Sequence, residues 1–126
     1  MSDLDSVYLA YIACLNARDW DRLGEFVAEE AVHNGRALGL GGYRKMLEGD
    51  VFEIPDLRFE VGLLAVQAPL VAARLDFDCT PRGTFLGLPV NGRRMSFAEH
   101  AFYAFRGDHI TEVWSVIDKA AIEAQL

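Results

Sequence analysis

The hydrophobic pattern changes its period once along the chain, at Pro55, and this change constrains the fold more than any other feature. Before Pro55, apolar residues recur at the three- and four-residue spacing of amphipathic helices. After Pro55, apolar and polar residues alternate, as in strands with one buried face. Helices followed by strands are typical of the α+β class. The 126 residues are enough for one domain, which we assign to 1–126.

The N-terminal half is predicted to form three helices. The first runs from a cap at Ser2 to about Ala17. The second follows Asp19, and the third begins near Tyr43 and ends before Pro55, because proline disrupts a helix interior. A brief extended segment, 31–34, and a glycine-rich loop join the last two. The second helix is expected to bury Trp20, Leu23, Phe26 and Val27.

Four strands are predicted to follow as an antiparallel meander. Asn91-Gly92 and Gly107-Asp108 favour the positive φ angles of two-residue hairpin turns, and strands 94–106 and 109–117 follow these turns. A short closing helix, 119–125, is expected to be capped by Asp118. Long strands with tight turns indicate a strongly curved sheet that can enclose a pocket, with the N-terminal helices as its lid. The inward residues of the first two strands are predicted to be Leu57, Phe59, Val61, Leu63 and Ala65, then Val71, Ala73, Leu75, Phe77 and Cys79.

Charge and composition exclude several classes of partner. The net charge of −7 opposes binding to a polyphosphate, which requires clustered Lys and Arg. No run approaches the roughly 18 apolar residues of a membrane span, and the acidic start lacks the basic residues of a secretory signal. Cys14 and Cys79 lack metal-type spacing and are interpreted as reduced thiols. We therefore expect a cytoplasmic protein that binds neither nucleic acid nor membrane.

Glu99 is the principal candidate for a catalytic residue. Successive side chains of a strand point to opposite faces, so Glu99 and His100 cannot act together. The face that carries Glu99 is the more apolar one and is assigned to the inside; its other members are Met95, Phe97, Ala101, Tyr103 and Phe105. Burial there would raise the pKa of Glu99 towards the range useful for proton transfer. The alternative is a buried Glu that pairs with an arginine or lies at the pocket rim.

His33 is the second candidate, because it follows the helical layer beside the glycine-rich loop and can face the pocket mouth. A hydrogen-bonded surface histidine is the alternative. Trp114 has the opposite parity to the inward residues of the last strand, so we expect a homodimer through the outer sheet face, with His100 and Phe102 in the contact. The predicted pocket residues are Tyr43, Phe97, Ala101, Tyr103, Val113, Ser115 and Ile117.

Metal and cofactor motifs are not apparent in the sequence. The three histidines share no metal-ligand spacing, and no G-x-S-x-G motif occurs. The glycines of the loop are not followed by the Lys-Ser/Thr of a phosphate-binding loop. The sequence therefore predicts an acid–base site without a metal or cofactor.

Several segments together resemble the SnoaL-like polyketide cyclases, also called predicted ester cyclases, of the nuclear transport factor 2-like superfamily. The segments are His33-Asn34-Gly35, 54–59, 87–93, 108–114 and the closing 118–126. The resemblance implies an α+β cone, a homodimer through the outer sheet face, and aldol ring closure of a polyketide methyl ester by an Asp without a cofactor. It places that Asp on Ser115 and an associated histidine on Ala101, so both residues are replaced here.

We therefore expect a small cofactor-independent enzyme of cyclase, isomerase or hydrolase type, in the lyase or isomerase class if cyclase-like. Its substrate would be a hydrophobic small molecule, with Glu99 as general acid or base and His33 assisting. Glu99 lies about 7 Å along the strand from Ala101, on the same face, and could carry the acid–base role from a shifted place. The alternative is a non-catalytic module of the same fold that binds a small ligand or a partner protein. The replacement of both family residues favours that alternative.

Overall fold

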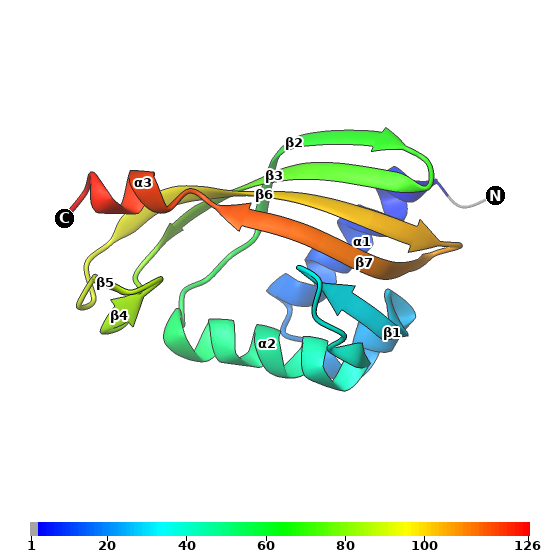
Figure 1. Cartoon of the computed structure of the whole chain (residues 1–126), viewed down its shortest axis with the longest axis horizontal. Helices are drawn as coiled ribbons and strands as arrows, with labels where there is room; N and C mark the ends of the chain where they lie inside the picture. Colours follow the sequence, from blue (N-terminus) through cyan, green and yellow to red (C-terminus); the bar gives the residue numbers. More distant parts are fainter. Residues whose placement is uncertain (1–2) are drawn as a thin grey trace.

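A curved five-stranded sheet dominates the computed structural model, which describes residues 3–126 (Figure 1). The strands lie in the order β1-β7-β6-β3-β2. Strands β2, β3, β6 and β7 form the predicted antiparallel meander, and β1 adds to it in parallel beside β7. The bounds are β1 Val27–His33, β2 Glu60–Gln67, β3 Leu70–Cys79, β6 Met95–Arg106 and β7 His109–Ile117.

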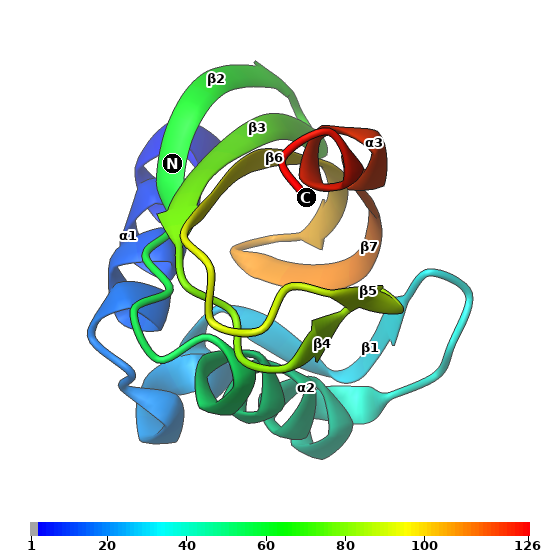
Figure 2. The same cartoon turned by 90° about the vertical axis from the view of Figure 1, so that its left-hand side faces the viewer.

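Two long helices cover the concave side of the sheet. Figure 2 shows the sheet curling over the interior, with α1 and α2 along the side that the sheet leaves open. Their bounds are α1 Leu4–Asn16 and α2 Gly39–Glu53; a short helix, α3 Lys119–Glu123, follows β7. This arrangement confirms the predicted α+β fold with a curved sheet, N-terminal helices and a short C-terminal helix. In the described part of the chain, no helix is long and apolar enough to cross a membrane.

The N-terminal elements differ from the prediction in detail. The proposed cap at Ser2 lies outside the described residues, and Asp3 caps α1 by accepting a hydrogen bond from the Asp5 N–H at 3.1 Å. The second helix is a six-residue 3-10 helix, η1 Trp20–Glu25. Val27 does not belong to that helix but begins β1, because the chain there pairs with β7. The third helix begins earlier than expected, at Gly39.

The register of β2 against β3 shifts at Gly62. A methyl group at Gly62 would lie 2.0 Å from a carboxylate oxygen of β3, so glycine lets the two strands approach at this irregularity. The shift reverses the faces of the residues that follow. The prediction that Leu63 and Ala65 point inward is therefore wrong: Leu63 is 67% exposed, whereas Leu64 and Val66 pack against the core.

Strands β3 and β6 alternate as predicted. The five inward residues of β3 are all buried, and the apolar inward residues of β6 are buried as well. Both cysteines are buried and free. The alternation therefore fixes which side chains of β6 face the helices.

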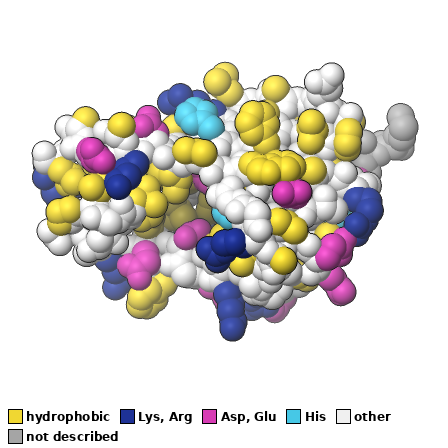
Figure 3. All heavy atoms as spheres, in the orientation of Figure 1, with side chains coloured by type: hydrophobic (Ala, Val, Ile, Leu, Met, Phe, Trp, Pro, Cys, Tyr) yellow, Lys and Arg dark blue, Asp and Glu magenta, His cyan; other side chains and the backbone are white. Residues whose placement is uncertain are grey.

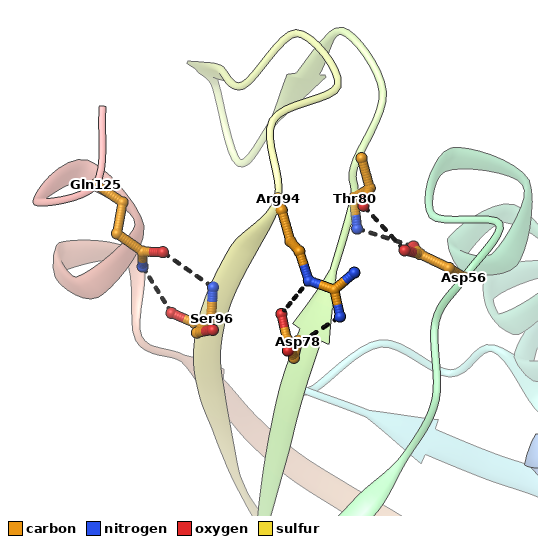
Figure 4. A network of polar contacts seen from close by, with 6 residues as sticks. All are labelled: Asp56, Asp78, Thr80, Arg94, Ser96 and Gln125. Carbon is orange, nitrogen blue, oxygen red and sulfur yellow. Dashed lines mark hydrogen bonds and ion pairs between the residues drawn. The ribbon is translucent and has the colours of Figure 1, made fainter.

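Three polar pairs fix the end of the sheet where α3 docks (Figure 4): Gln125 with Ser96, Arg94 with Asp78, and Thr80 with Asp56. The Gln125 amide accepts from the Ser96 N–H at 3.0 Å and donates to the Ser96 carbonyl at 2.6 Å, which ties α3 to β6. The Asp56 carboxylate accepts from the Thr80 N–H at 2.8 Å and from its hydroxyl at 2.9 Å. Asp118 caps α3, as predicted, by accepting from the Ala121 N–H at 3.1 Å.

The loop between β3 and β6 contains a small hairpin of its own, β4 Thr84–Phe85 and β5 Leu88–Pro89. Its two-residue turn is Leu86–Gly87, with φ angles of 52° and 77°. Asn91 and Gly92 also have positive φ, at 50° and 76°, but their N–H groups close the loop onto its own beginning. Asn91-Gly92 therefore does not join two paired strands, and the predicted hairpin at this turn is wrong. Strand β6 pairs with β3 and not with β5, the strand that precedes the turn.

Candidate functional site

A cavity of about 400 Å³ lies between the concave face of the sheet and the helices. The space-filling view shows a hollow with recessed hydrophobic side chains between the two ends of the molecule (Figure 3). The walls of the cavity are largely apolar or aromatic and come from α1, α2, β3, β6 and β7. Its polar and ionisable lining residues are Tyr11, His33, Asn34, Tyr43, Asp50, Glu99, Tyr103, Ser115 and Lys119.

Glu99 projects from β6 into this cavity, on the face that strand parity assigns to the inside. Burial raises the pKa of its carboxyl group from 4.5 to about 7. A hydrogen bond with Ser115 opposes this rise, and the charge of Asp50 adds to it. Among residues 3–126, no ion pair involves Glu99. The group is therefore a weak acid that changes its charge near neutral pH.

His33 lies at the end of β1, where the Nε2 atom is 3.3 Å from the Ser115 hydroxyl. Burial, and next the charge of Arg36, lower the pKa of His33 below 6.5, so the ring is neutral at neutral pH. The edge of this ring also meets Tyr43, with the ring centres 6.3 Å apart. His33 thus presents a neutral imidazole to the cavity, beside a hydroxyl that also reaches Glu99.

Asn34 connects this histidine segment to β7. Its side-chain amide donates to the Ser115 carbonyl at 3.1 Å and accepts from the Ser115 N–H at 2.8 Å. The two bonds imitate a strand partner and extend the pairing of β1 and β7 by one residue, although Asn34 itself has φ 48°. Asn34 therefore positions both His33 and Ser115, a role that the sequence analysis did not assign.

All four tyrosines of the chain lie in one cluster, of which the sequence analysis had placed only Tyr43 and Tyr103 in the pocket. The Tyr8 hydroxyl donates to the Tyr103 hydroxyl at 3.1 Å, and the Tyr11 and Tyr43 hydroxyls are 2.6 Å apart. Burial raises the pKa of every one of these phenols, and the charge of Glu99 raises it further for Tyr8, Tyr43 and Tyr103. The phenols remain neutral, and Tyr103, which accepts from Tyr8, keeps its own O–H free to donate in the cavity.

Asp50 is a second cavity carboxylate that the sequence analysis missed. It lies on α2, three residues after Leu47 and seven after Tyr43, and helical geometry puts all three on one face. The residue as a whole is exposed, yet burial of its carboxyl group raises the pKa from 3.8 to about 6. The available signal was an acidic residue within the apolar stripe of a helix.

The predicted pocket residues take three different positions. The cavity lining includes Tyr43, Tyr103, Val113, Ser115 and Ile117. Phe97 lines a separate apolar recess of about 60 Å³, which also reaches Glu99. Ala101 is only 2% exposed and is not among the residues that line the cavity. The predicted role of Ala101 in the pocket and the catalytic roles of Glu99 and His33 remain predictions.

Aromatic residues mark the outer face of the sheet, as their parity predicts. Phe102 lies opposite Trp114 in the β6–β7 register, and their side chains are 58% and 42% exposed. His100 is exposed on the same face, and Val116 is 71% exposed. Hydrophobic side chains gather over this part of the sheet in Figure 3. The homodimer through this face remains a prediction.

Among residues 3–126, no group of His, Cys, Asp and Glu is arranged to hold a metal ion.

Comparisons with known proteins agree with this architecture. The sequence profile of the SnoaL-like polyketide cyclases matches residues 5–126. A crystal structure of a SnoaL-like polyketide cyclase from Agrobacterium tumefaciens superposes with a TM-score of 0.98 and 54% identity, over 99% of this chain and 98% of that one. IdmH from Streptomyces antibioticus, named as a candidate polyketide cyclase, shares the fold with a TM-score of 0.84, 21% identity and 98% of each chain covered.

AclR from Streptomyces galilaeus, named as a candidate hydroxylase, also shares the fold. Its TM-score is 0.78 at 23% identity, over 97% of this chain and 93% of that one. No match was found among curated protein sequences.

Proposed function

The chain belongs to the SnoaL-like polyketide cyclase family, and from this premise we propose a cofactor-independent enzyme that moves protons on a hydrophobic carbonyl compound by means of Glu99. The proposed reaction is of cyclase type, or an isomerisation or hydrolysis with the same proton transfers. One observation carries the proposal: a carboxyl group without an ionic partner among residues 3–126 lies in a largely apolar cavity, and its pKa is raised to about 7.

The proposed chemistry begins at a C–H bond next to a carbonyl group. The ionised Glu99 carboxylate takes that proton, and the electron pair of the C–H bond forms an enolate. In a cyclase, the enolate carbon then forms a bond to a second carbonyl carbon of the same molecule, and the oxygen of that carbonyl receives the proton back from Glu99. A base whose pKa is near the working pH is both ionised and strong enough for this transfer.

The neutral hydrogen-bond donors of the cavity support this route. A developing enolate oxygen needs donors that are already in place and shielded from water. The phenol of Tyr103 and the imidazole of His33 line the same cavity as Glu99. The proposed role of His33 is to donate to the substrate oxygen or to hold Ser115 in position, 3.3 Å away.

The walls support a hydrophobic substrate of modest size. The cavity of about 400 Å³ is within the usual range of small-molecule sites. Aromatic side chains such as Tyr43 and Phe59 line it. The recess beside Phe97 continues as an apolar surface next to the reacting carboxylate. A flat molecule with carbonyl groups on an apolar framework fits this combination of surfaces.

A binding module is the second candidate, and a specific observation favours it. The resemblance places the family's catalytic Asp and its histidine on Ser115 and Ala101 of this chain, so neither group is present at its usual place. A non-catalytic protein would still hold an apolar ligand in the cavity but would not exchange its protons. Ligand that co-purifies with the protein, identified by mass spectrometry, would name the bound molecule.

Deuterium incorporation tests the enzyme proposal without the natural substrate. A panel of aryl methyl ketones and aryl 3-oxo esters, with naphthyl methyl ketone as the first member, is incubated with the protein in D₂O. Loss of the α-proton signal is then followed by proton NMR. The native protein should accelerate exchange above the buffer rate, and Glu99→Gln should reduce that acceleration by about 10²- to 10⁴-fold.

Glu123→Gln is the matched control, because Glu123 is an exposed carboxylate on α3 outside the cavity lining. It should exchange at the native rate. Full activity in Glu99→Gln would refute the assignment of Glu99. Failure of the native protein to accelerate exchange of any ketone in the panel would favour the binding module instead.

A further inference from the structure

Two carboxyl-bearing residues line the same interior space. Glu99 projects from β6 and Asp50 from α2, and both line the main cavity and also the smaller recess beside Phe97. The two elements lie on opposite sides of the interior in the end-on view (Figure 2). Burial is the main cause of the raised pKa of Glu99, and the charge of Asp50 raises it further. Any molecule large enough to fill the cavity would contact both.

No cation balances these two carboxylates in the described part of the chain. Lys119 lines the mouth of the cavity from α3, but it is exposed and forms no ion pair with either group. His33 on β1 is neutral at neutral pH. The other titratable groups of the lining are phenols that remain protonated: Tyr11 on α1, Tyr43 on α2 and Tyr103 on β6. A like charge in such a site disfavours ionisation of both groups together, which favours a state in which the pair keeps one proton.

We propose that Asp50 is a second catalytic residue, which works with Glu99 as a pair that holds one proton, so that one carboxyl group accepts the proton of the substrate while the other donates one. This inference rests on the proposed function and deepens it by assigning the second half of the acid–base chemistry.

The pair of carboxyl groups holds one proton both before and after each turnover. At the start one group is ionised and the other is protonated. The ionised carboxylate removes the proton from carbon, and the C–H electron pair becomes the new carbon–carbon bond to the second carbonyl. The protonated carboxyl donates its proton to the oxygen of that carbonyl, which becomes a hydroxyl. The pair ends with one proton, carried by the opposite partner, and a transfer through water restores the starting state.

Asp50 is an exposed residue that nevertheless lines the cavity. It continues the inward stripe of α2 formed by Tyr43 and Leu47, which are 2% and 4% exposed. Glu48 on the same helix shows the contrast, because it pairs with Arg44 at 3.5 Å outside the cavity lining. These two acidic residues of the helix therefore differ in their surroundings: Asp50 is exposed but lines the cavity, whereas Glu48 forms an ion pair outside it.

Asp50→Asn tests the pair, with Glu48→Gln as the control on the same helix. The first measurement titrates the Glu99 side-chain carboxyl by carbon-13 NMR of glutamate-labelled protein without any added ligand. Removal of the Asp50 charge should lower the pKa of Glu99 below its native value of about 7. The second measurement is deuterium exchange into naphthyl methyl ketone, which should slow by about 10²-fold or more. Glu48→Gln should change neither.

The outcomes separate this inference from the proposed function. A shifted Glu99 titration together with slowed exchange supports the pair. An unchanged titration refutes the shared proton, and a native exchange rate in Asp50→Asn refutes the catalytic role of Asp50. Retained exchange in Glu99→Gln would instead refute the proposed function, and the ligand-free titration would still report whether the two carboxylates are coupled.

Discussion

Replacement of Glu99 by glutamine should make the protein more stable at alkaline pH, because the native protein must ionise a buried carboxyl group there. Burial raises the pKa of Glu99 from 4.5 to about 7 in the folded protein, whereas the unfolded chain ionises it near 4.5. The folded state therefore binds this proton more tightly than the unfolded state. By linkage, this part of the stability is fully present below pH 4.5 and is lost as the pH rises through about 7.

The size of the effect follows from the pKa difference. The rise from 4.5 to about 7 corresponds to about 3 kcal/mol of unfolding free energy, at about 1.4 kcal/mol for each pKa unit. This figure is an upper value, since the side chain keeps some contact with solvent in the cavity. Glutamine has nearly the same shape and cannot ionise, so Glu99→Gln should not lose this contribution between acid and alkaline pH.

Urea unfolding at about pH 4.5 and about pH 8 measures the difference, with the fluorescence of Trp20 and Trp114 as the signal. The unfolding free energy of the native protein should fall more between the two pH values than that of Glu99→Gln, by up to about 3 kcal/mol. Glu123→Gln, in which an exposed carboxylate is replaced, should follow the native protein. Equal losses of stability in the native protein and in Glu99→Gln would refute the burial of an ionisable Glu99.

Two further predictions concern the supports of the site and the outer sheet face. Asn34→Gly keeps the positive φ of 48° but removes the two hydrogen bonds of the Asn34 side-chain amide to Ser115. It should lower the unfolding free energy in urea by about 1 kcal/mol and slow proton exchange. Unchanged values for both would contradict the positioning role of Asn34. Trp114 and Phe102 form an exposed aromatic pair on the outer sheet face. Trp114→Ser should therefore convert a native dimer to a monomer in sedimentation at micromolar concentration. A native protein that already sediments as a monomer would contradict the predicted dimer.

The inward position of Glu99 could be predicted because β6 is long and its alternation is uninterrupted around that residue. Its one irregularity against β7 lies between Ala104 and Phe105, beyond Glu99 towards the turn. In β2 the same rule fails after Gly62, because a register shift reverses the faces of Leu63 and Ala65. Parity is therefore reliable only up to the first irregularity, and a glycine within a strand is the residue at which to expect one.

Contacts between segments that are distant in the sequence could not be predicted from local hydrophobic patterns. The strand β1 forms by parallel pairing with β7, which no periodicity in residues 27–33 reveals. The Tyr8 and Tyr103 hydroxyls meet from opposite ends of the chain. Asp50 was within reach, since its spacing from Tyr43 is helical, but a pattern that counts only apolar residues as inward passes over a carboxylate that lines the cavity.

The titration of the Glu99 carboxyl in the native protein tests the central claim most directly. Carbon-13 NMR of glutamate-labelled protein, assigned with Glu99→Gln, should show one side-chain carboxyl that titrates at about 7. A Glu99 carboxyl that titrates near 4.5, the ordinary value for glutamate, would show that the group is hydrated or paired, and would contradict a proton-transfer role inside the cavity.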